Sequence, residues 1–245
     1  MYNGTAEQCP AAGGAPHLEE HHLPNLDLVI LDLDGTLYSS TATTLGAVDR
    51  AVRDLNARHG DVAEMPSNEL ILSGVGCTRE EFARKVFPAL SEEYIEEIDD
   101  LIWHWERTLV DDGRGSLFPG AVEALEEMRG LGLKLGVATN AGSGYMNHIL
   151  DFFEVRRFFD EARCAGDENT RHKGELIDII TGNLAVEPGR TAMVGDRRSD
   201  IHGAREAGAL AVGCTWGFAS RDELADADRV VDNFAELTEL LRSWP

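Results

Sequence analysis

The chain has 245 residues, with 44 acidic against 22 basic side chains and a formal net charge of −22. Such an acidic surface argues against nucleic acid or an anionic membrane as a general partner, although a local cation can still create a site for an anionic substrate. No apolar run approaches the roughly 20 residues that span a bilayer, and no basic region precedes an apolar stretch at the N-terminus. We therefore expect a cytoplasmic protein with no nucleic-acid or membrane partner.

Residues 1–25 mix Gly, Pro, Ala, Glu and His without periodicity, which predicts a disordered N-terminal tail. The tail contains the stretch HLEEHH, which we interpret as a solvated polar segment rather than a metal site. The four cysteines are scattered along the chain without a CxxC pair. They are therefore expected to be free thiols in a reducing compartment rather than a zinc or redox motif.

From residue 26 onward, short apolar runs alternate with helical patterns. The runs are bulky and continuous, as in parallel strands that are buried on both faces. They lie at 27–33, 133–139, 191–196, 209–215 and 229–232. Apolar residues at helical spacing occupy 120–132, 143–154, 174–184 and 234–244. Strands that alternate with helices predict an α/β fold with an open parallel sheet and right-handed crossovers.

Residues 41–117 break this alternation. Apolar residues recur at helical spacing over 43–60 and over 91–109, which predicts a small all-helical domain inserted after the first strand. Its tryptophans, Trp103 and Trp105, are expected in its interior. The predicted boundaries are 1–25 for the tail, 26–40 and 118–245 for the sheet domain, and 41–117 for the helical domain.

Two aspartates interrupt the first apolar run, LVILDLDGTL, at positions 32 and 34. An unpaired carboxylate inside a buried strand is costly, so we expect both side chains to emerge at the end of the strand. Other polar residues stand at the ends of later strands or at the start of a helix: Thr139, Asn140, Lys173, Asp196 and Asp200. Singly, each is explained by turn or cap chemistry. Together they predict a ligand site at the carboxyl edge of the sheet, where converging carboxylates need a divalent cation.

In this order the segments resemble the motifs of the haloacid dehalogenase superfamily, in its phosphatase branch. The matching residues are Asp32-x-Asp34-Gly35-Thr36, Thr139-Asn140, Lys173 and Gly195-Asp196-x-x-x-Asp200. The helical insertion is similar to the cap of phosphoglycolate-phosphatase-like members, and the resemblance covers about residues 27–243. It implies a Rossmann-like parallel sheet core with an inserted all-helical cap domain. It also implies a Mg²⁺-dependent phosphatase that hydrolyses a small phosphorylated metabolite, a phosphoglycolate-like phosphomonoester, through an aspartyl-phosphate intermediate.

The resemblance implies a role for each matching residue. Asp32 is expected to be the nucleophile, Asp34 the general acid and base, and Lys173 the cation that offsets their charge. The expected metal ligands are Asp32, Asp196 and Asp34, the last through its backbone carbonyl. Asp200 is expected to orient metal-bound water or Lys173. The expected phosphate-binding residues are Gly35, Thr36, Thr139, Asn140 and Lys173.

Two details depart from the family's commoner pattern. Lys173 is followed by Gly174, where a proline is frequent, so Arg171 is an alternative cation. Arg197 and Arg198 follow the last metal-ligand candidate, and we expect both to be exposed to solvent because surface arginines are common.

Other functions of the same branch stay open at this point. A phosphomutase would differ mainly in how well the cap excludes water, and a catalytically silent phosphate-binding module would keep the fold without turnover. A dehalogenase is disfavoured because its chemistry needs no acid at Asp34. A phosphonate-cleaving enzyme would need a cap lysine that forms a Schiff base, and it is disfavoured because the cap's one lysine, Lys85, has the pattern of an ordinary exposed helix residue. Arg79 and Arg84 are cap candidates for binding a substrate carboxylate. The protein is expected to be a monomer or a homodimer.

Overall fold

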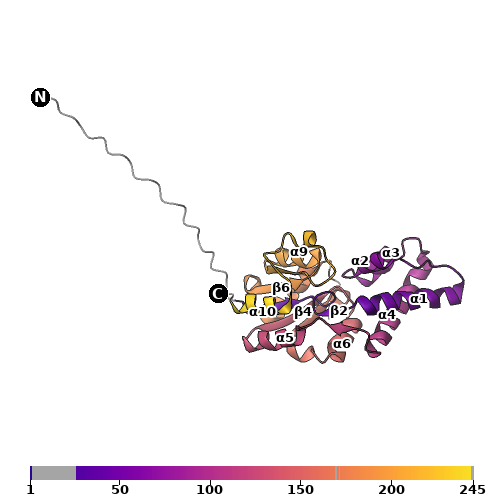
Figure 1. Cartoon of the computed structure of the whole chain (residues 1–245), viewed down its shortest axis with the longest axis horizontal. Coiled ribbons are helices and arrows are strands. Elements are labelled where there is room, and N and C mark those ends of the chain that lie inside the picture. Colours follow the sequence, from indigo (N-terminus) through magenta and orange to yellow (C-terminus); the bar gives the residue numbers. More distant parts are fainter. Residues whose placement is uncertain (2–25, 169, 171, 244–245) are drawn as a thin grey trace.

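The structure is a computed structural model that describes residue 1, residues 26–168, residue 170 and residues 172–243. The predicted tail after Met1 and the alternative cation Arg171 lie outside the described residues. Figure 1 shows a sheet domain, which carries α5 (Ala121–Gly130), α9 (Arg198–Ala207) and α10 (Phe234–Arg242), and a helical domain of α1 (Thr41–His59) to α4 (Glu92–Asp111) at the opposite end of the molecule.

The sheet domain is built on six parallel strands in the order β5-β4-β1-β6-β7-β8. The strands are β1 (Leu28–Leu31), β4 (Lys134–Thr139), β5 (Glu161–Cys164), β6 (Thr191–Gly195), β7 (Leu210–Cys214) and β8 (Arg229–Val231). The predicted α/β fold with a parallel sheet is therefore confirmed. Five of these strands coincide with the predicted apolar runs, and β5 was not predicted.

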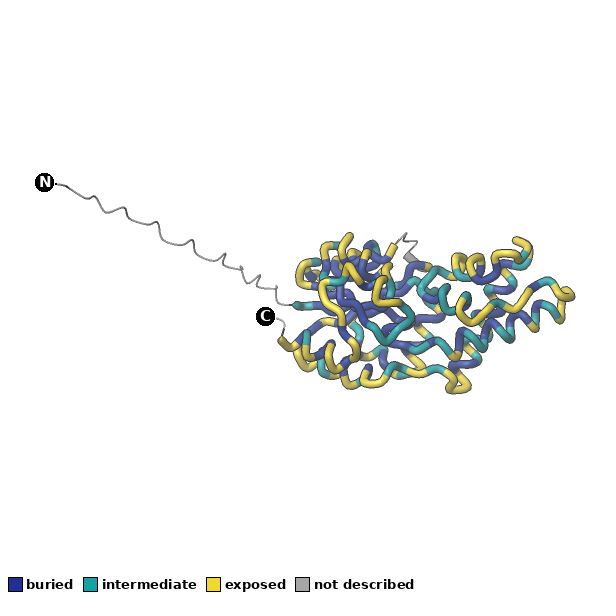
Figure 2. Tube along the Cα trace, turned by 45° about the horizontal axis from the view of Figure 1, so that its top comes forward, coloured by how far each residue is buried: buried dark blue, intermediate teal, exposed yellow. Residues whose placement is uncertain are grey.

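Helices cover both faces of the sheet. Because side chains alternate along a strand, Val29 and Leu31 of β1 join one hydrophobic cluster while Leu28 and Ile30 join another. The helices are α5 (Ala121–Gly130), α6 (Ser143–Phe152), α7 (Ala165–Glu168), α8 (Lys173–Leu184), α9 (Arg198–Ala207) and α10 (Phe234–Arg242). Short 3₁₀ turns lie at Arg156–Phe158, Pro188–Arg190 and Arg221–Leu224. Figure 2 shows the strands as the buried centre, with exposed residues on the outer sides of the helices.

The insertion forms a separate helical cap. It contains α1 (Thr41–His59), α2 (Asn68–Gly74), α3 (Arg79–Val86) and α4 (Glu92–Asp111). Val48 and Leu55 of α1 pack with Ile98 of α4 in a hydrophobic cluster that is distinct from those of the sheet. A two-residue antiparallel pairing of β2 (Tyr38–Ser39) with β3 (Ser116–Leu117) stands where the chain enters and leaves the cap. The exact domain boundaries stay a prediction.

The two cap tryptophans have different surroundings. Trp105 packs against the cap cluster and its indole N–H donates to Asp54 at 2.8 Å, in agreement with the prediction. Trp103 instead packs against the sheet-domain cluster, with its ring centroid 6.0 Å from that of Tyr145. The prediction that Trp103 lies in the cap interior was therefore wrong, because the face of α4 that carries it is turned toward the sheet domain. Among the described residues, no helix is long and apolar enough to cross a membrane.

Candidate active site

The predicted site residues meet at the carboxyl edge of the sheet. Asp32 follows β1, Thr139 ends β4 and Asp196 follows β6. Because β4, β1 and β6 are adjacent and parallel, their carboxyl ends bring these three residues together. Lys173 begins α8, and Asp200 lies in the first turn of α9.

Lys173 forms a buried ionic network with two of the aspartates. Its Nζ lies 2.8 Å from Oδ1 of Asp32 and 3.0 Å from Oδ1 of Asp200, and it also donates to the carbonyl of Ala138 at 2.9 Å. Burial alone would lower the pKa of Lys173, but Asp200 and Asp32 raise it above its usual value. Lys173 is therefore a fixed positive charge at the edge of the sheet.

Asp32, Asp196 and Asp200 form a carboxylate cluster. All three are buried, and each contributes an oxygen that lies within 4.8 Å of the others. Burial, followed by the charge of Asp200, raises the pKa of Asp32 well above its usual value, and the same two causes raise the pKa of Asp196 to about 7. One lysine cannot neutralise three carboxylates. The cluster is therefore a site that could hold a divalent cation with oxygen ligands.

The DGT segment after β1 is shaped around Asp196. The hydroxyl of Thr36 donates to Oδ1 of Asp196 at 3.3 Å, and the backbone N–H of Phe218 donates to Oδ2 at 2.7 Å. Gly35 has φ +83°, and a Cβ there would come within 2.5 Å of Oδ2 of Asp196. A glycine is therefore required both by the backbone and by the close approach of the carboxylate.

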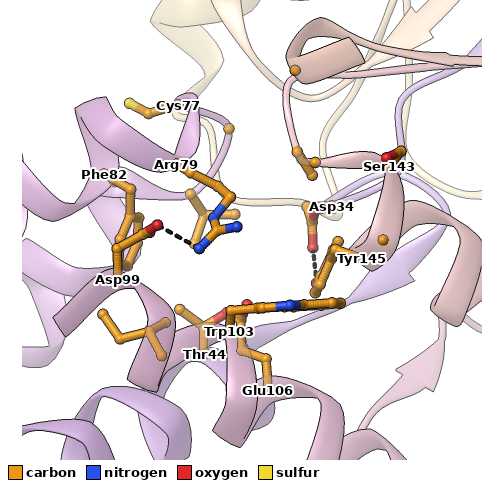
Figure 3. A pocket seen from close by; sticks show the side chains of 18 residues that line it. Asp34, Thr44, Cys77, Arg79, Phe82, Asp99, Trp103, Glu106, Ser143 and Tyr145 are labelled. Carbon is orange, nitrogen blue, oxygen red and sulfur yellow. Dashed lines mark hydrogen bonds and ion pairs between the residues drawn. The ribbon is translucent and has the colours of Figure 1, made fainter. Parts of the chain in front are cut away.

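The side chain of Asp34 points away from the carboxylate cluster. It accepts a hydrogen bond from the hydroxyl of Tyr145 at 2.7 Å and lines a cavity between the two domains (Figure 3). Burial raises the pKa of Asp34, which the hydrogen bond from Tyr145 partly opposes. The carboxylates that gather are thus those of Asp32, Asp196 and Asp200, while that of Asp34 faces the cavity.

Thr139 and Asn140 lie beside the cluster. The hydroxyl of Thr139 accepts from the backbone N–H of Ala141 at 3.1 Å, which tightens the turn after β4. The side-chain amide of Asn140 donates to the carbonyl of Gly76, in the cap, at 2.8 Å. Their backbone N–H groups and the Thr139 hydroxyl are placed at the sheet edge, and their phosphate-binding roles stay predictions.

The cavity between the domains has a volume of about 350 Å³. The sheet domain contributes Asp34 and Tyr145 to its wall, and the cap contributes Thr44, Arg79, Phe82, Asp99, Trp103 and Glu106. Arg79 is paired with Asp99 at 2.5 Å and with Asp100 at 3.2 Å. Glu106 accepts from the hydroxyl of Thr44 at 3.1 Å, and burial followed by the charge of Asp34 raises the pKa of Glu106 to about 8. Arg84 is paired with Glu80 and Glu92 at the surface.

The sequence did not indicate Tyr145 and Glu106 as residues of the site, and the predicted exposure of Arg197 differs from the structure. Tyr145 and Glu106 occupy ordinary positions of amphipathic helices, so their spacing carries no sign of a site. Arg197 was predicted to be exposed, but 14% of its side chain is exposed and its guanidinium donates to backbone carbonyls of the cap. That prediction was wrong because the docked cap covers the loop after β6. Arg198 is exposed, as predicted.

Comparison with known proteins adds four similarities. The family model of the haloacid dehalogenase-like hydrolases matches residues 29–214. The chain is 29% identical over 217 residues to the probable phosphatase IndB of Dickeya dadantii, covering 86% of this chain and 91% of that protein. It is 27% identical over 245 residues to a phosphoglycolate phosphatase of Salmonella typhimurium, and the match covers 89% of this chain and 94% of that protein. The crystal structure of a predicted phosphoglycolate phosphatase from Haemophilus somnus has the same fold, with a TM-score of 0.78 and 21% identity. The superposition covers 89% of this chain and 99% of that one.

Proposed function

Since the chain belongs to the haloacid dehalogenase-like hydrolase family, we propose that this phosphatase hydrolyses a small phosphorylated metabolite with the help of bound Mg²⁺. The observation that carries the proposal is the buried carboxylate cluster in contact with Lys173. Asp32, Asp196 and the backbone carbonyl of Asp34 would hold the cation, because Mg²⁺ prefers oxygen ligands. When bound, Mg²⁺ supplies positive charge that stabilises the phosphoryl oxygens in the transition state.

In this proposal Asp32 is the nucleophile. Its Oδ1 accepts from the backbone N–H of Leu33 at 2.8 Å and contacts Nζ of Lys173 at 2.8 Å, which fixes the orientation of the carboxylate. Attack on phosphorus forms an aspartyl-phosphate and divides one displacement into two easier ones. The groups proposed to bind the phosphoryl oxygens are Gly35, Thr36, Thr139, Asn140 and Lys173. Asp200 is proposed to orient Lys173, with which it is paired.

Asp34 is proposed to be the general acid and base. Its carboxyl lines the cavity where the leaving group would lie, and burial raises its pKa, which favours the protonated form that an acid needs. It protonates the departing alkoxide and then accepts a proton from the water that attacks the aspartyl-phosphate. Tyr145, which donates to Asp34, holds this carboxyl at the cavity wall.

The cavity also bears on the class of substrate. Arg79 is already paired with two aspartates, so it is a weak partner for a substrate carboxylate. Glu106 adds a carboxyl group to the same wall, which supplies no positive charge in either protonation state. We therefore propose a leaving group without a carboxylate, such as a sugar or polyol, rather than phosphoglycolate. The cavity volume of about 350 Å³ is adequate for such a group. A cytoplasmic location and a monomeric or homodimeric state stay predictions.

Release of inorganic phosphate from p-nitrophenyl phosphate, measured with Mg²⁺ and with EDTA, tests the proposal. We expect turnover with Mg²⁺, none with EDTA, and none in the Asp32→Asn variant. Phosphate binding without turnover would instead indicate a silent phosphate-binding module. Exchange between sugar phosphate isomers without phosphate release would indicate a phosphomutase. A panel of glycerol phosphate, sugar phosphates and phosphoglycolate then tests the leaving-group class.

A further inference from the structure

Arg197 connects the carboxylate cluster to the cap. In the chain it lies between Asp196 and the first turn of α9, but its side chain runs into the cap. Its Nη2 donates to the carbonyl of Val75 at 2.6 Å, and its Nε donates to the same carbonyl at 3.0 Å. Nη2 also lies 3.3 Å from the carbonyls of Leu72 and Ser73. One guanidinium therefore reaches three carbonyls of the cap.

These carbonyls belong to a short segment, residues 72–77, that we call the docking loop. It includes the end of α2, where the carbonyl of Leu72 also accepts from the backbone N–H of Val75 and the carbonyl of Ser73 from Lys85. A guanidinium suits such an end, because it offers several donors and a positive charge to the negative end of the helix dipole. Arg197 is held in place by Glu223, 3.7 Å away, and by the ring of Phe218.

A second side chain of the sheet domain holds the same loop. Asn140 donates to the carbonyl of Gly76 at 2.8 Å. Gly76 has φ +93°, and a Cβ there would lie 3.2 Å from Cγ of Arg197. Arg197 follows Asp196 directly, and Asn140 follows Thr139 directly. The docking loop thus contacts Arg197, which follows the proposed metal ligand Asp196, and Asn140, which is itself a proposed phosphate-binding residue.

The docking loop forms part of the cavity wall. Val75, Gly76 and Cys77 line the cavity, and Arg79 follows two residues later on α3. Asp34 lines the same cavity from the sheet domain. In this structure the docked loop therefore forms a wall of the same cavity that the proposed general acid lines.

We propose that Arg197 is a positioning residue that docks the cap over the cavity and thereby increases the affinity for the leaving group. The kinetic part of this proposal rests on the proposed phosphatase function. The side chain can be separated from the carboxylate cluster, because it is the backbone N–H of Arg197 that donates to Oδ2 of Asp200, at 2.9 Å. Replacement of the side chain leaves that hydrogen bond available.

The test compares Arg197→Ala with Arg198→Ala, which removes the same charge from the exposed neighbouring position. The measured quantities are kcat and KM for p-nitrophenyl phosphate, the inhibition constant of inorganic phosphate, and the Mg²⁺ concentration for half activation. We expect KM to rise about tenfold in Arg197→Ala, the loss typical of one hydrogen bond to a charged group. Phosphate inhibition and Mg²⁺ activation should stay within about twofold, because both depend on the sheet domain. Arg197→Lys should restore part of the affinity.

Two outcomes overturn the proposal. A KM for Arg197→Ala that equals that of Arg198→Ala shows that the contacts with the cap do not affect substrate binding. If the Mg²⁺ concentration for half activation of Arg197→Ala rises together with its KM, the side chain acts through the carboxylate cluster instead.

Amide hydrogen exchange tests the docking without any turnover. Amides of the docking loop and α2 should exchange faster in Arg197→Ala than in the wild type, and should be unchanged in Arg198→Ala. If the wild type hydrolyses nothing, the phosphatase proposal fails while this measurement still decides the docking role. Unchanged exchange in Arg197→Ala overturns that role.

Discussion

Asp196 should make the metal-free protein less stable as the pH rises. Its carboxyl is buried, and burial together with Asp200 raises its pKa from 3.8 to about 7. In the unfolded chain the same group would lose its proton near pH 4. Between about pH 4 and pH 7 the unfolded chain carries an ionised, solvated Asp196. Over the same range the folded protein must either keep the proton on Asp196 or bury its charge.

The magnitude follows from proton linkage. A pKa that rises from 3.8 to about 7 costs about 4 kcal/mol of unfolding free energy. Below about pH 4 both states hold the proton and the stability is fully present. The stability is lost progressively as the pH rises to about 7, and the full cost applies above that. Asp32, whose pKa is also raised by burial and by Asp200, acts in the same direction.

The assay is unfolding by guanidinium chloride in EDTA at pH 5 and pH 8, for the wild type and Asp196→Asn. We expect the variant to be more stable than the wild type at pH 8, and this advantage to shrink at pH 5. Added Mg²⁺ should stabilise the wild type at pH 8, because a ligand that binds the folded state alone stabilises it. It should have little effect on Asp196→Asn, which lacks one proposed metal ligand.

An exposed aspartate provides the matched control. Asp226→Asn removes the same charge from a solvent-exposed position, so its stability should follow the wild type at both pH values. The reasoning is refuted if Asp196→Asn and Asp226→Asn show the same pH dependence. It is refuted equally if Mg²⁺ stabilises Asp196→Asn as much as the wild type.

Three further substitutions test the proposed chemistry. Asp32→Asn should lower turnover of p-nitrophenyl phosphate below about 1% while the circular dichroism spectrum is kept, and higher activity would remove Asp32 as the nucleophile. Tyr145→Phe removes a hydrogen bond that lowers the pKa of Asp34. The alkaline limb of the pH profile of kcat, measured with glycerol phosphate, should therefore move to higher pH. A limb that stays in place or moves to lower pH contradicts this role of Tyr145. At pH 9, above the pKa of Glu106 of about 8, Glu106→Gln should lower KM for phosphoglycolate about tenfold relative to glycerol phosphate, since it removes a carboxylate from the cavity wall. At pH 6, where Glu106 is protonated, the ratio of the two KM values should stay close to that of the wild type; an unchanged ratio at pH 9 removes Glu106 from specificity.

The central strands could be predicted because they are buried on both faces. The residues of β1 and β6 are all buried, so they appear in the sequence as continuous apolar runs. Strand β5 could not be predicted in this way. It lies at the edge of the sheet, its sequence is EARC, and three of its four residues are only partly buried. The helices of the cap were predictable where apolar residues repeat over several turns, as in α1 and α4.

The carboxylate cluster and Lys173 could be predicted because each residue stands at the end of a strand or the start of a helix. The sheet order then brings them together. The contacts between the domains could not be predicted, because they depend on how the cap sits on the sheet domain. Tyr145 is 111 positions from Asp34, and Arg197 is 122 positions from Val75. Nothing in the spacing of those residues indicates either contact.

A crystal structure of the protein grown with Mg²⁺ and beryllofluoride tests the central proposal most directly, because beryllofluoride mimics the phosphoryl group of an aspartyl-phosphate. We predict beryllofluoride attached to the Asp32 carboxylate, with Mg²⁺ bound by Asp32, Asp196 and the carbonyl of Asp34, and with Lys173 in contact. Beryllofluoride or Mg²⁺ bound elsewhere, with the carboxylate cluster empty, would contradict the proposed phosphatase site.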